Sequence, residues 1–227
     1  MKLYILLVVT LVFTAQGMNL LKQDWFDTHP NVEWVFEALI NGTDYVGEEL
    51  YSFEYNVMKF HYTSPDGNIP AFDALFDYTK GEMLLYFNLT GDCQKVPLEK
   101  MDMKAHWRDV FYNHTEYAGK RGHLDLYEAK EPDHESRRWV YGFMAPHQDT
   151  GKQEFVPTRL QVHNPYSHGD YSYQFIDTLT FPKVKASDFE YPQCDKAELT
   201  KMDISLVPSA VAANPYFIDQ VVLAQTQ

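Results

Sequence analysis

The sequence predicts a mainly β protein built on an antiparallel sheet. Two observations carry this prediction. Aromatic and aliphatic residues alternate with polar residues along a series of short segments, and polar connections containing Gly or Pro separate these segments without a helical crossover. Aromatic residues make up 15% of the chain, and much of this content lies in the alternating runs. A sheet of this kind is expected to curl into a sandwich or an open barrel.

The first half of the chain contains two expected hairpins. Residues 51–57 and 58–62 alternate with opposite parity, and such a switch is typical of a turn or bulge between antiparallel strands. Residues 74–78 and 83–89 alternate in the same way, and the turn sequence at 79–82 separates them.

The second half repeats the pattern in four further runs. These are HLDLYEAK (123–130), RRWVYGFMA (137–145), TRLQVHN (158–164) and YSYQFID (171–177). Three stretches fit this scheme less well. VEWVFEALI (32–40) has the periodicity of a helix but also that of a strand, MDMKAHWRDVFYN (101–113) fits a short helix, and NPYFIDQVVLAQ (214–225) fits a helix that begins at Pro215.

Residues 1–17 are interpreted as a secretory signal peptide. Lys2 precedes an apolar run at 3–13, and residues 15–17 (Ala-Gln-Gly) place small side chains where a signal peptidase cleaves. The apolar run is shorter than the roughly 20 residues that span a bilayer. The alternative is a short buried strand at the N-terminus. We therefore expect a secreted, extracellular protein.

The remaining chain, residues 18–227, is expected to form a single domain that ends in a tail at about 195–227. No later apolar stretch reaches spanning length, so no transmembrane segment is expected. The formal net charge of −13 argues against nucleic acid and anionic membrane surfaces as partners, because like charges repel.

The sequence offers no recognisable catalytic constellation. It has no Gly-x-Ser-x-Gly elbow, phosphate loop, His-Glu-x-x-His motif, dinucleotide fingerprint or EF-hand loop. His163 and His168 lie five residues apart, whereas metal ligands on one face of a strand need an even spacing. We therefore expect no enzyme, no cofactor and no metal site, although a diffuse acidic surface could still attract calcium.

Two cysteines and three sequons fit an extracellular glycoprotein. In an oxidising compartment Cys93 and Cys194 are expected to form one disulfide, the alternative being two free buried thiols. Asn41, Asn88 and Asn113 each begin an Asn-x-Thr sequon without proline in the middle. Asn88 and Cys93 fall within six residues, so a sugar and a crosslink are expected side by side.

Several longer segments resemble a known family when taken in order. They are EYN (54–56), FDALFDYTKGEMLLYFNLTGDCQKVPL (72–98), YSYQFIDTLTF (171–181) and FEYPQC (189–194). Their order and spacing are similar to those of the ependymin-related proteins and the LolA-like secreted proteins of animals. The resemblance runs loosely from Trp34 to Cys194.

This resemblance implies a strongly bent antiparallel sheet, half of a barrel, that encloses a hydrophobic cavity and carries a few short helices. It implies that residues 32–40 form the first strand, and that Cys93–Cys194 is the structural bridge. Members of the family are extracellular glycoproteins that bind lipids or other hydrophobic molecules. Vertebrate ependymins have further cysteines that this chain lacks, which places it nearer the LolA-like branch. Homodimerisation and calcium binding therefore stay open.

The expected function is binding or carriage of a hydrophobic small-molecule ligand in the cavity. The alternative is an extracellular structural or adhesion glycoprotein whose core is filled by its own side chains. If the sheet curls around a ligand, the inward residues should be the aromatic and aliphatic residues of one parity in the central strands. The candidates are Phe76, Tyr78, Leu85, Phe87, Trp139, Tyr141, Phe143, Tyr173 and Phe175.

Overall fold

A computed structural model describes most of the chain between residues 25 and 199. The described residues are 25–40, 43–67, 71–109, 115–130, 137–146, 151, 153–163 and 171–199. The expected signal peptide (1–17), the expected helix at 214–225 and all of the tail beyond residue 199 lie outside the described residues.

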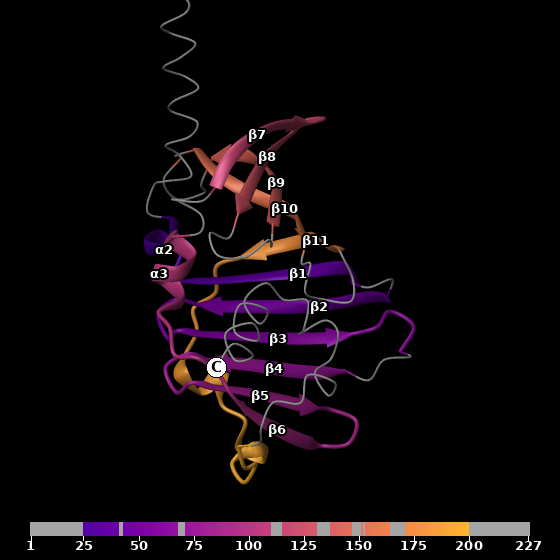
Figure 1. The fold of residues 1–227 in the computed structure, drawn as a ribbon, viewed down its shortest axis with the longest axis vertical. Helices are drawn as coiled ribbons and strands as arrows, with labels where there is room; N and C mark the ends of the chain where they lie inside the picture. The colour runs from indigo at the N-terminus through magenta and orange to yellow at the C-terminus, as the bar shows by residue number, and fades with distance from the viewer. Residues whose placement is uncertain are drawn as a thin grey trace, which may run out of the picture.

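Within the described residues, eleven strands form one antiparallel sheet, which confirms the predicted mainly β fold (Figure 1). They are β1 Asn31–Ile40, β2 Thr43–Ser52, β3 Val57–Thr63, β4 Phe72–Asp77, β5 Glu82–Phe87, β6 Asp92–Pro97, β7 Thr115–Arg121, β8 Leu124–Lys130, β9 Arg137–Pro146, β10 Gln153–His163 and β11 Tyr171–Thr180. Their order is β6-β5-β4-β3-β2-β1-β11-β10-β9-β8-β7. The chain therefore builds one half outward from β1 to the edge strand β6. It then starts the other half at the opposite edge with β7 and builds inward until β11 pairs with β1.

Short helices accompany the sheet, as expected. They are α2 Trp25–Thr28, α3 Met103–Arg108 and the 3-10 helices η2 Ala186–Phe189 and η3 Pro192–Cys194. The Asp102 side chain accepts a hydrogen bond from the Ala105 N–H and so caps α3, and Met103 and Trp107 are the buried residues of that helix. The ambiguous segment 32–40 is a strand, because both of its edges pair with neighbouring strands.

The register divides the side chains between two faces of the sheet, since directly paired residues point to the same side. One row joins Trp34, Glu49, Phe60, Ala74 and Leu85 across β1 to β5. All five are buried, and we call this side the core face.

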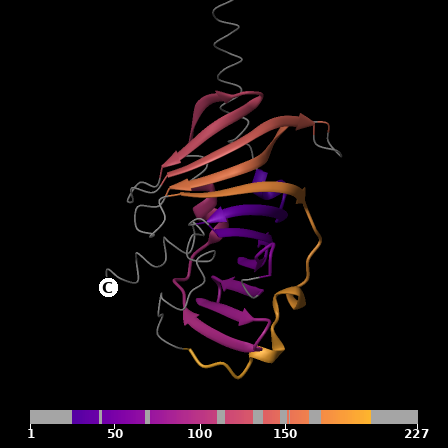
Figure 2. The same ribbon diagram turned by 90° about the vertical axis from the view of Figure 1, so that its right-hand side faces the viewer.

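The next row joins Val35, Glu48, His61, Asp73 and Tyr86 on the opposite side of the same strands. We call that side the strap face, because residues 181–199 run along it after β11. Figure 2 shows this segment beside β1–β6. Phe189 packs there with Val57, Leu75 and Leu84 of β3, β4 and β5.

Aromatic side chains dominate the core face of β1–β6. The largest fully buried side chains of the described residues are Tyr62, Tyr78, Phe36, Phe60, Phe72, Phe76, Met58, Met83, Leu85 and Met103. At one end of the strands, Trp107 of α3 meets Phe26, Tyr51 and Phe53 edge-on, with ring centroids 5.1–5.7 Å apart. Edge-on packing of this kind adds about 0.5–1.5 kcal/mol per pair to the gain from burial.

The sheet is strongly bent, as Figures 1 and 2 show, with β7–β10 turned away from the plane of β1–β6. Two glycines allow aromatic rings to cross the strands closely. A Cβ atom on Gly47 would lie 2.3 Å from the carbonyl oxygen of His61 and 3.1 Å from the Phe36 ring. A Cβ atom on Gly142 would lie 2.5 Å from the ring of Phe155. Any larger residue at either position would therefore push a strand or a ring aside.

Candidate functional site

The nine expected cavity residues fall on two different faces of the sheet. Phe76, Tyr78, Leu85 and Phe87 lie in or against the buried cluster of the core face. They come from β4, from the turn after it and from β5, and the first three are almost completely buried. The structure therefore brings together the four candidates from the first half of the chain.

The five candidates from the second half lie at strap-face positions. The register pairs Phe175 with Glu37 and Tyr173 with Leu39, and Glu37 and Leu39 are both exposed on the strap face. The side chains of Tyr173 and Phe175 themselves lie outside the described residues.

The same register continues from β11 across β10 into β9. Gln161 pairs with both Tyr173 and Trp139, and Arg159 pairs with both Phe175 and Tyr141. Trp139 and Tyr141 therefore lie on the strap face, at the same side of the sheet as the positions of Tyr173 and Phe175. The Arg159 guanidinium lies 4.9 Å from the centroid of the Tyr141 ring, a cation–π contact.

Phe143 follows Tyr141 by two residues on β9 and is 38% exposed. The nine positions consequently do not line a single surface.

A β-bulge in the β1–β11 ladder explains the division. Trp34 pairs with Leu179, but Phe36 pairs with Ile176, so β11 contains one residue more than β1 at this point. One extra residue reverses the parity of every position that follows along the strand. Regular alternation from Leu179 would have placed Phe175 on the core face, whereas the bulge places Ile176 there and Phe175 on the strap face.

The core face continues into the second half as a strip that sequence reasoning missed. Its members are Tyr117, Tyr127, Phe155, Leu160 and Ile176, and we call them the apolar strip. The Tyr127 ring lies 5.4 Å from that of Tyr117 and 5.0 Å from that of Phe155. Leu160 pairs with the buried Val140, and Ile176 packs against the aromatic cluster of the first half.

The apolar strip is more open to solvent than the aromatic cluster beside it. Tyr117 is 44% exposed, and Phe155, Leu160 and Ile176 are all partly exposed. Burial, followed by the charge of Asp125, raises the pKa of Tyr127 to about 12, so its phenol is neutral at physiological pH. The five side chains of the strip are thus uncharged, and Ile176 joins the strip to the core.

A carboxylate lies inside the aromatic cluster. Glu49 is completely buried, and its Oε2 accepts hydrogen bonds from Trp34 Nε1 and the Tyr51 hydroxyl, both at 2.6 Å. Its Oε1 accepts a third bond, also 2.6 Å long, from the Tyr62 hydroxyl. Burying a carboxylate is costly unless donors surround it, and these three donors offset that cost. The sequence shows Glu48 and Glu49 as two adjacent acidic residues, and it does not indicate which of them is buried.

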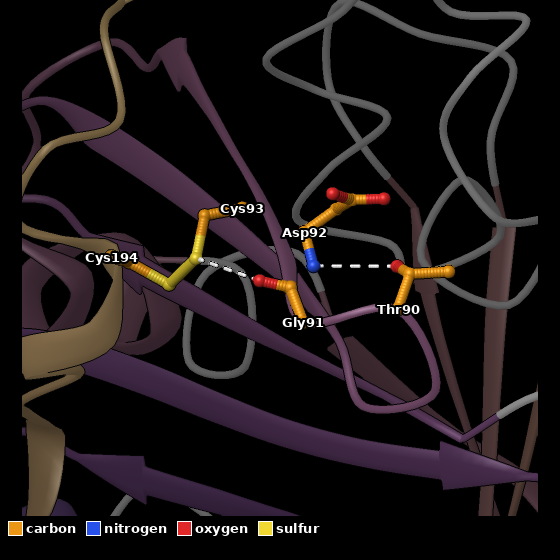
Figure 3. Close-up of a disulfide and its surroundings, with 5 residues drawn as sticks. All are labelled: Thr90, Gly91, Asp92, Cys93 and Cys194. Carbon is orange, nitrogen blue, oxygen red and sulfur yellow. Dashed lines mark hydrogen bonds between the residues drawn. A yellow bond between two sulfur atoms is a disulfide. The ribbon is translucent and has the colours of Figure 1, made fainter.

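The predicted disulfide between Cys93 and Cys194 is present (Figure 3). Cys93 is the second residue of β6, and Cys194 ends η3. The bond therefore fastens the end of the strap-face segment to the edge strand of the sheet. The Asp92 N–H donates to Thr90 Oγ1 in the adjoining turn, where the sequon of Asn88 ends.

Glycosylation is expected at Asn88 in particular. This residue is exposed in the turn that follows β5, whereas Asn41 and Asn113 lie outside the described residues. We expect peptide mapping of secreted protein to find a glycan on Asn88, and Asn88→Gln to remove the corresponding mass. A bare Asn88 in secreted material would contradict this prediction.

Within the described ranges, no group of three or more His, Cys, Asp or Glu side chains is arranged to hold a metal ion. No helix among the described residues is long and apolar enough to cross a membrane.

Comparison with known proteins finds similarity to solved structures. No family model and no curated protein matches the sequence. An uncharacterized conserved protein from Thermus thermophilus matches the structure with a TM-score of 0.52 and 9% identity, covering 83% of this chain and 99% of that chain. A likeness at this identity concerns the fold alone.

Two other solved structures resemble this chain more weakly. A DUF1329 family protein from Desulfovibrio piger has a TM-score of 0.39 and 11% identity, over 78% of this chain and 97% of that chain. A LolA superfamily protein from Nitrosomonas europaea has a TM-score of 0.36 and 10% identity, over 71% of this chain and 89% of that chain. Membership of the ependymin-related family stays a prediction.

Proposed function

We propose that the protein is a secreted glycoprotein that binds a hydrophobic small molecule, such as a lipid, on the core face of its bent sheet. The observation that carries this proposal is the apolar strip. Apart from the buried Tyr127, its side chains are at most partly buried, although they continue the apolar surface of the core. A partly exposed apolar surface of this kind gains free energy when a ligand covers it, by about 25 cal/mol per Å².

The ligand surface differs from the cavity expected from the sequence. The aromatic cluster of β1–β6 is packed by its own side chains, and its rings lie about as close as in ordinary protein cores. We therefore place the ligand over β8–β11, against Phe155, Leu160 and Ile176. Neutral phenols at Tyr117 and Tyr127 would border its more polar end.

The proposal is tested by native mass spectrometry of protein purified from its secreting cells, followed by lipid extraction and titration with a fluorescent fatty-acid probe. We expect a co-purifying apolar molecule and saturable uptake of the probe. Absence of both would reject the proposal.

A matched pair of phenylalanine substitutions locates the ligand surface. Phe155 lies on the core face, and Phe143 lies on a neighbouring strand at a strap-face position. We expect Phe155→Ala to weaken probe binding about tenfold or more, because a buried phenyl group contributes roughly 1.5–3 kcal/mol. Phe143→Ala should leave the affinity unchanged. Equal losses in the two variants would show that the ligand does not lie on this face.

The alternative function is that of an extracellular structural or adhesion glycoprotein with a self-filled core. The dense packing of the aromatic cluster in β1–β6 favours it. The two functions differ in one observable: a structural glycoprotein would neither carry a lipid from its source nor lose probe binding on Phe155→Ala.

A further inference from the structure

Between residues 189 and 194, three successive contacts fasten the strap-face segment to the sheet. Phe189 packs into the apolar cluster of Val57, Leu75 and Leu84, and Cys194 is bonded to Cys93. The point between them is the side chain of Tyr191. The two outer fastenings are apolar and covalent, whereas the middle one is surrounded by titratable groups.

The Tyr191 ring sits over β4. Its centroid lies 6.0 Å from that of Tyr86 on β5 and 5.4 Å from Lys59 Nζ on β3. The same Lys59 amino group donates a hydrogen bond of 3.0 Å to the carbonyl oxygen of Asp188 in the segment. The ring thus bridges β3 and β5 and covers the outward residues of the strand between them.

Asp73 is one of these outward residues. The register places it directly opposite both His61 on β3 and Tyr86 on β5. Its Oδ1 lies 2.5 Å from His61 Nδ1, and the side chain is only 16% exposed against 40% for His61. Asp73 is therefore a nearly covered carboxylate whose charge His61 can neutralise.

We propose that His61, Asp73 and Tyr191 form a proton-operated latch that holds residues 186–191 on the sheet. With His61 protonated, Asp73 is neutralised beneath the buried Tyr191 hydroxyl and the segment stays docked. Loss of that proton removes the positive charge of His61 from the covered Asp73 carboxylate, so this part of the segment opens more often. The Cys93–Cys194 bond keeps its far end attached in both states.

The charges around His61 support this assignment. The hydrogen bond to Asp73 is the largest influence and raises the pKa of His61, and the charges of Asp73 and Glu48 act in the same direction. Burial and the charge of Lys59 oppose them. Burial, and after it Asp73, also raise the pKa of Tyr191, which keeps the phenol neutral. Tyr86 on β5, which packs against the Tyr191 ring, and Asp188 and Glu190 of the segment itself are further titratable side chains at this point.

The direction of the pH dependence follows from linkage. Because the folded pKa of His61 lies above its ordinary value of 6.5, the stabilisation is complete below that value. It is lost as the pH rises through the folded pKa. The latch therefore holds in mildly acidic surroundings and loosens as the pH rises through the folded pKa of His61, and its release uncovers the apolar cluster under Phe189.

Hydrogen exchange of the full chain tests the latch. We expect the opening equilibrium constant of residues 186–191, corrected for intrinsic exchange rates, to rise about two- to fivefold between about pH 5.5 and about pH 8. A change of this size corresponds to the loss of a partly exposed ion pair. His61→Gln should abolish this step. His123→Gln is the matched control, because His123 is exposed in the turn between β7 and β8, and it should leave the step intact.

A second measurement distinguishes the latch from an isolated ion pair. Phe189→Ala should weaken docking of the segment while the disulfide remains, and the His61 pKa measured by NMR should then fall toward 6.5. An unchanged His61 pKa in this variant would overturn the proposal. So would an undiminished pH step in His61→Gln.

Discussion

Replacing Glu49 with leucine is expected to destabilise the protein by about 3 kcal/mol or more. The substitution removes the acceptor of three buried donors, Trp34 Nε1 and the hydroxyls of Tyr51 and Tyr62. Each buried donor left without a partner costs about 1–3 kcal/mol. The leucine side chain can fill the volume but cannot accept a hydrogen bond. Urea denaturation, which reports the free energy of unfolding, measures the loss.

Glu48→Leu is the matched control for this substitution. Glu48 is adjacent in sequence but exposed on the strap face, so its replacement should change stability by no more than about 0.5 kcal/mol. Glu49→Gln should fall between the two, because an amide retains one acceptor oxygen but turns an NH₂ group toward another donor. Equal stabilities of the Glu48→Leu and Glu49→Leu proteins would show that the network does not stabilise the core.

Removing the disulfide is expected to cost up to about 4.7 kcal/mol, the chain-entropy value for a closed loop of roughly 100 residues. The sequence separation of Cys93 and Cys194 is 101 residues. Cys194 is also almost completely buried, so opening the bond should loosen the end of the strap-face segment as well. Cys93→Ser and Cys194→Ser should each show the loss in denaturant titrations of oxidised protein.

The double substitution provides the control, because the bond is lost entirely when either partner is removed. It should be no less stable than either single variant. Reduction of the native protein should bring its stability to the level of the variants. Two free thiols titrating in unfolded, unreduced protein would contradict the presence of the bond.

The sequence determined the local architecture of this protein. Alternation marked the strands of both halves, and the turn at residues 79–82 marked the hairpin of β4 and β5. These patterns can be recognised in the sequence because apolar and polar residues alternate with a period of two within each strand, and turn residues follow it. The disulfide could be predicted for another reason, because two cysteines allow only one intramolecular pairing.

The sequence determined less of the candidate site. It predicted that Phe76 and Leu85 point inward as cavity residues, and both lie in the buried cluster, in a hairpin of regular register. It gave no sign of Phe155 or Ile176 as surface for a ligand. The aromatic residues of YSYQFID and RRWVYGFMA stand out by composition, but composition does not say which side of a strand faces the core.

In the second half of the sheet, only the tertiary structure decided which side of each strand faces the core. A single extra residue in β11, between the partners of Val35 and Phe36, reverses the alternation, and a bulge has no fixed sequence signature. The partners of Glu49 and of Tyr191 were likewise decided by contacts between distant segments. Local periodicity records how a strand alternates, whereas the face that it buries depends on the register with its neighbour, which is a property of the folded chain.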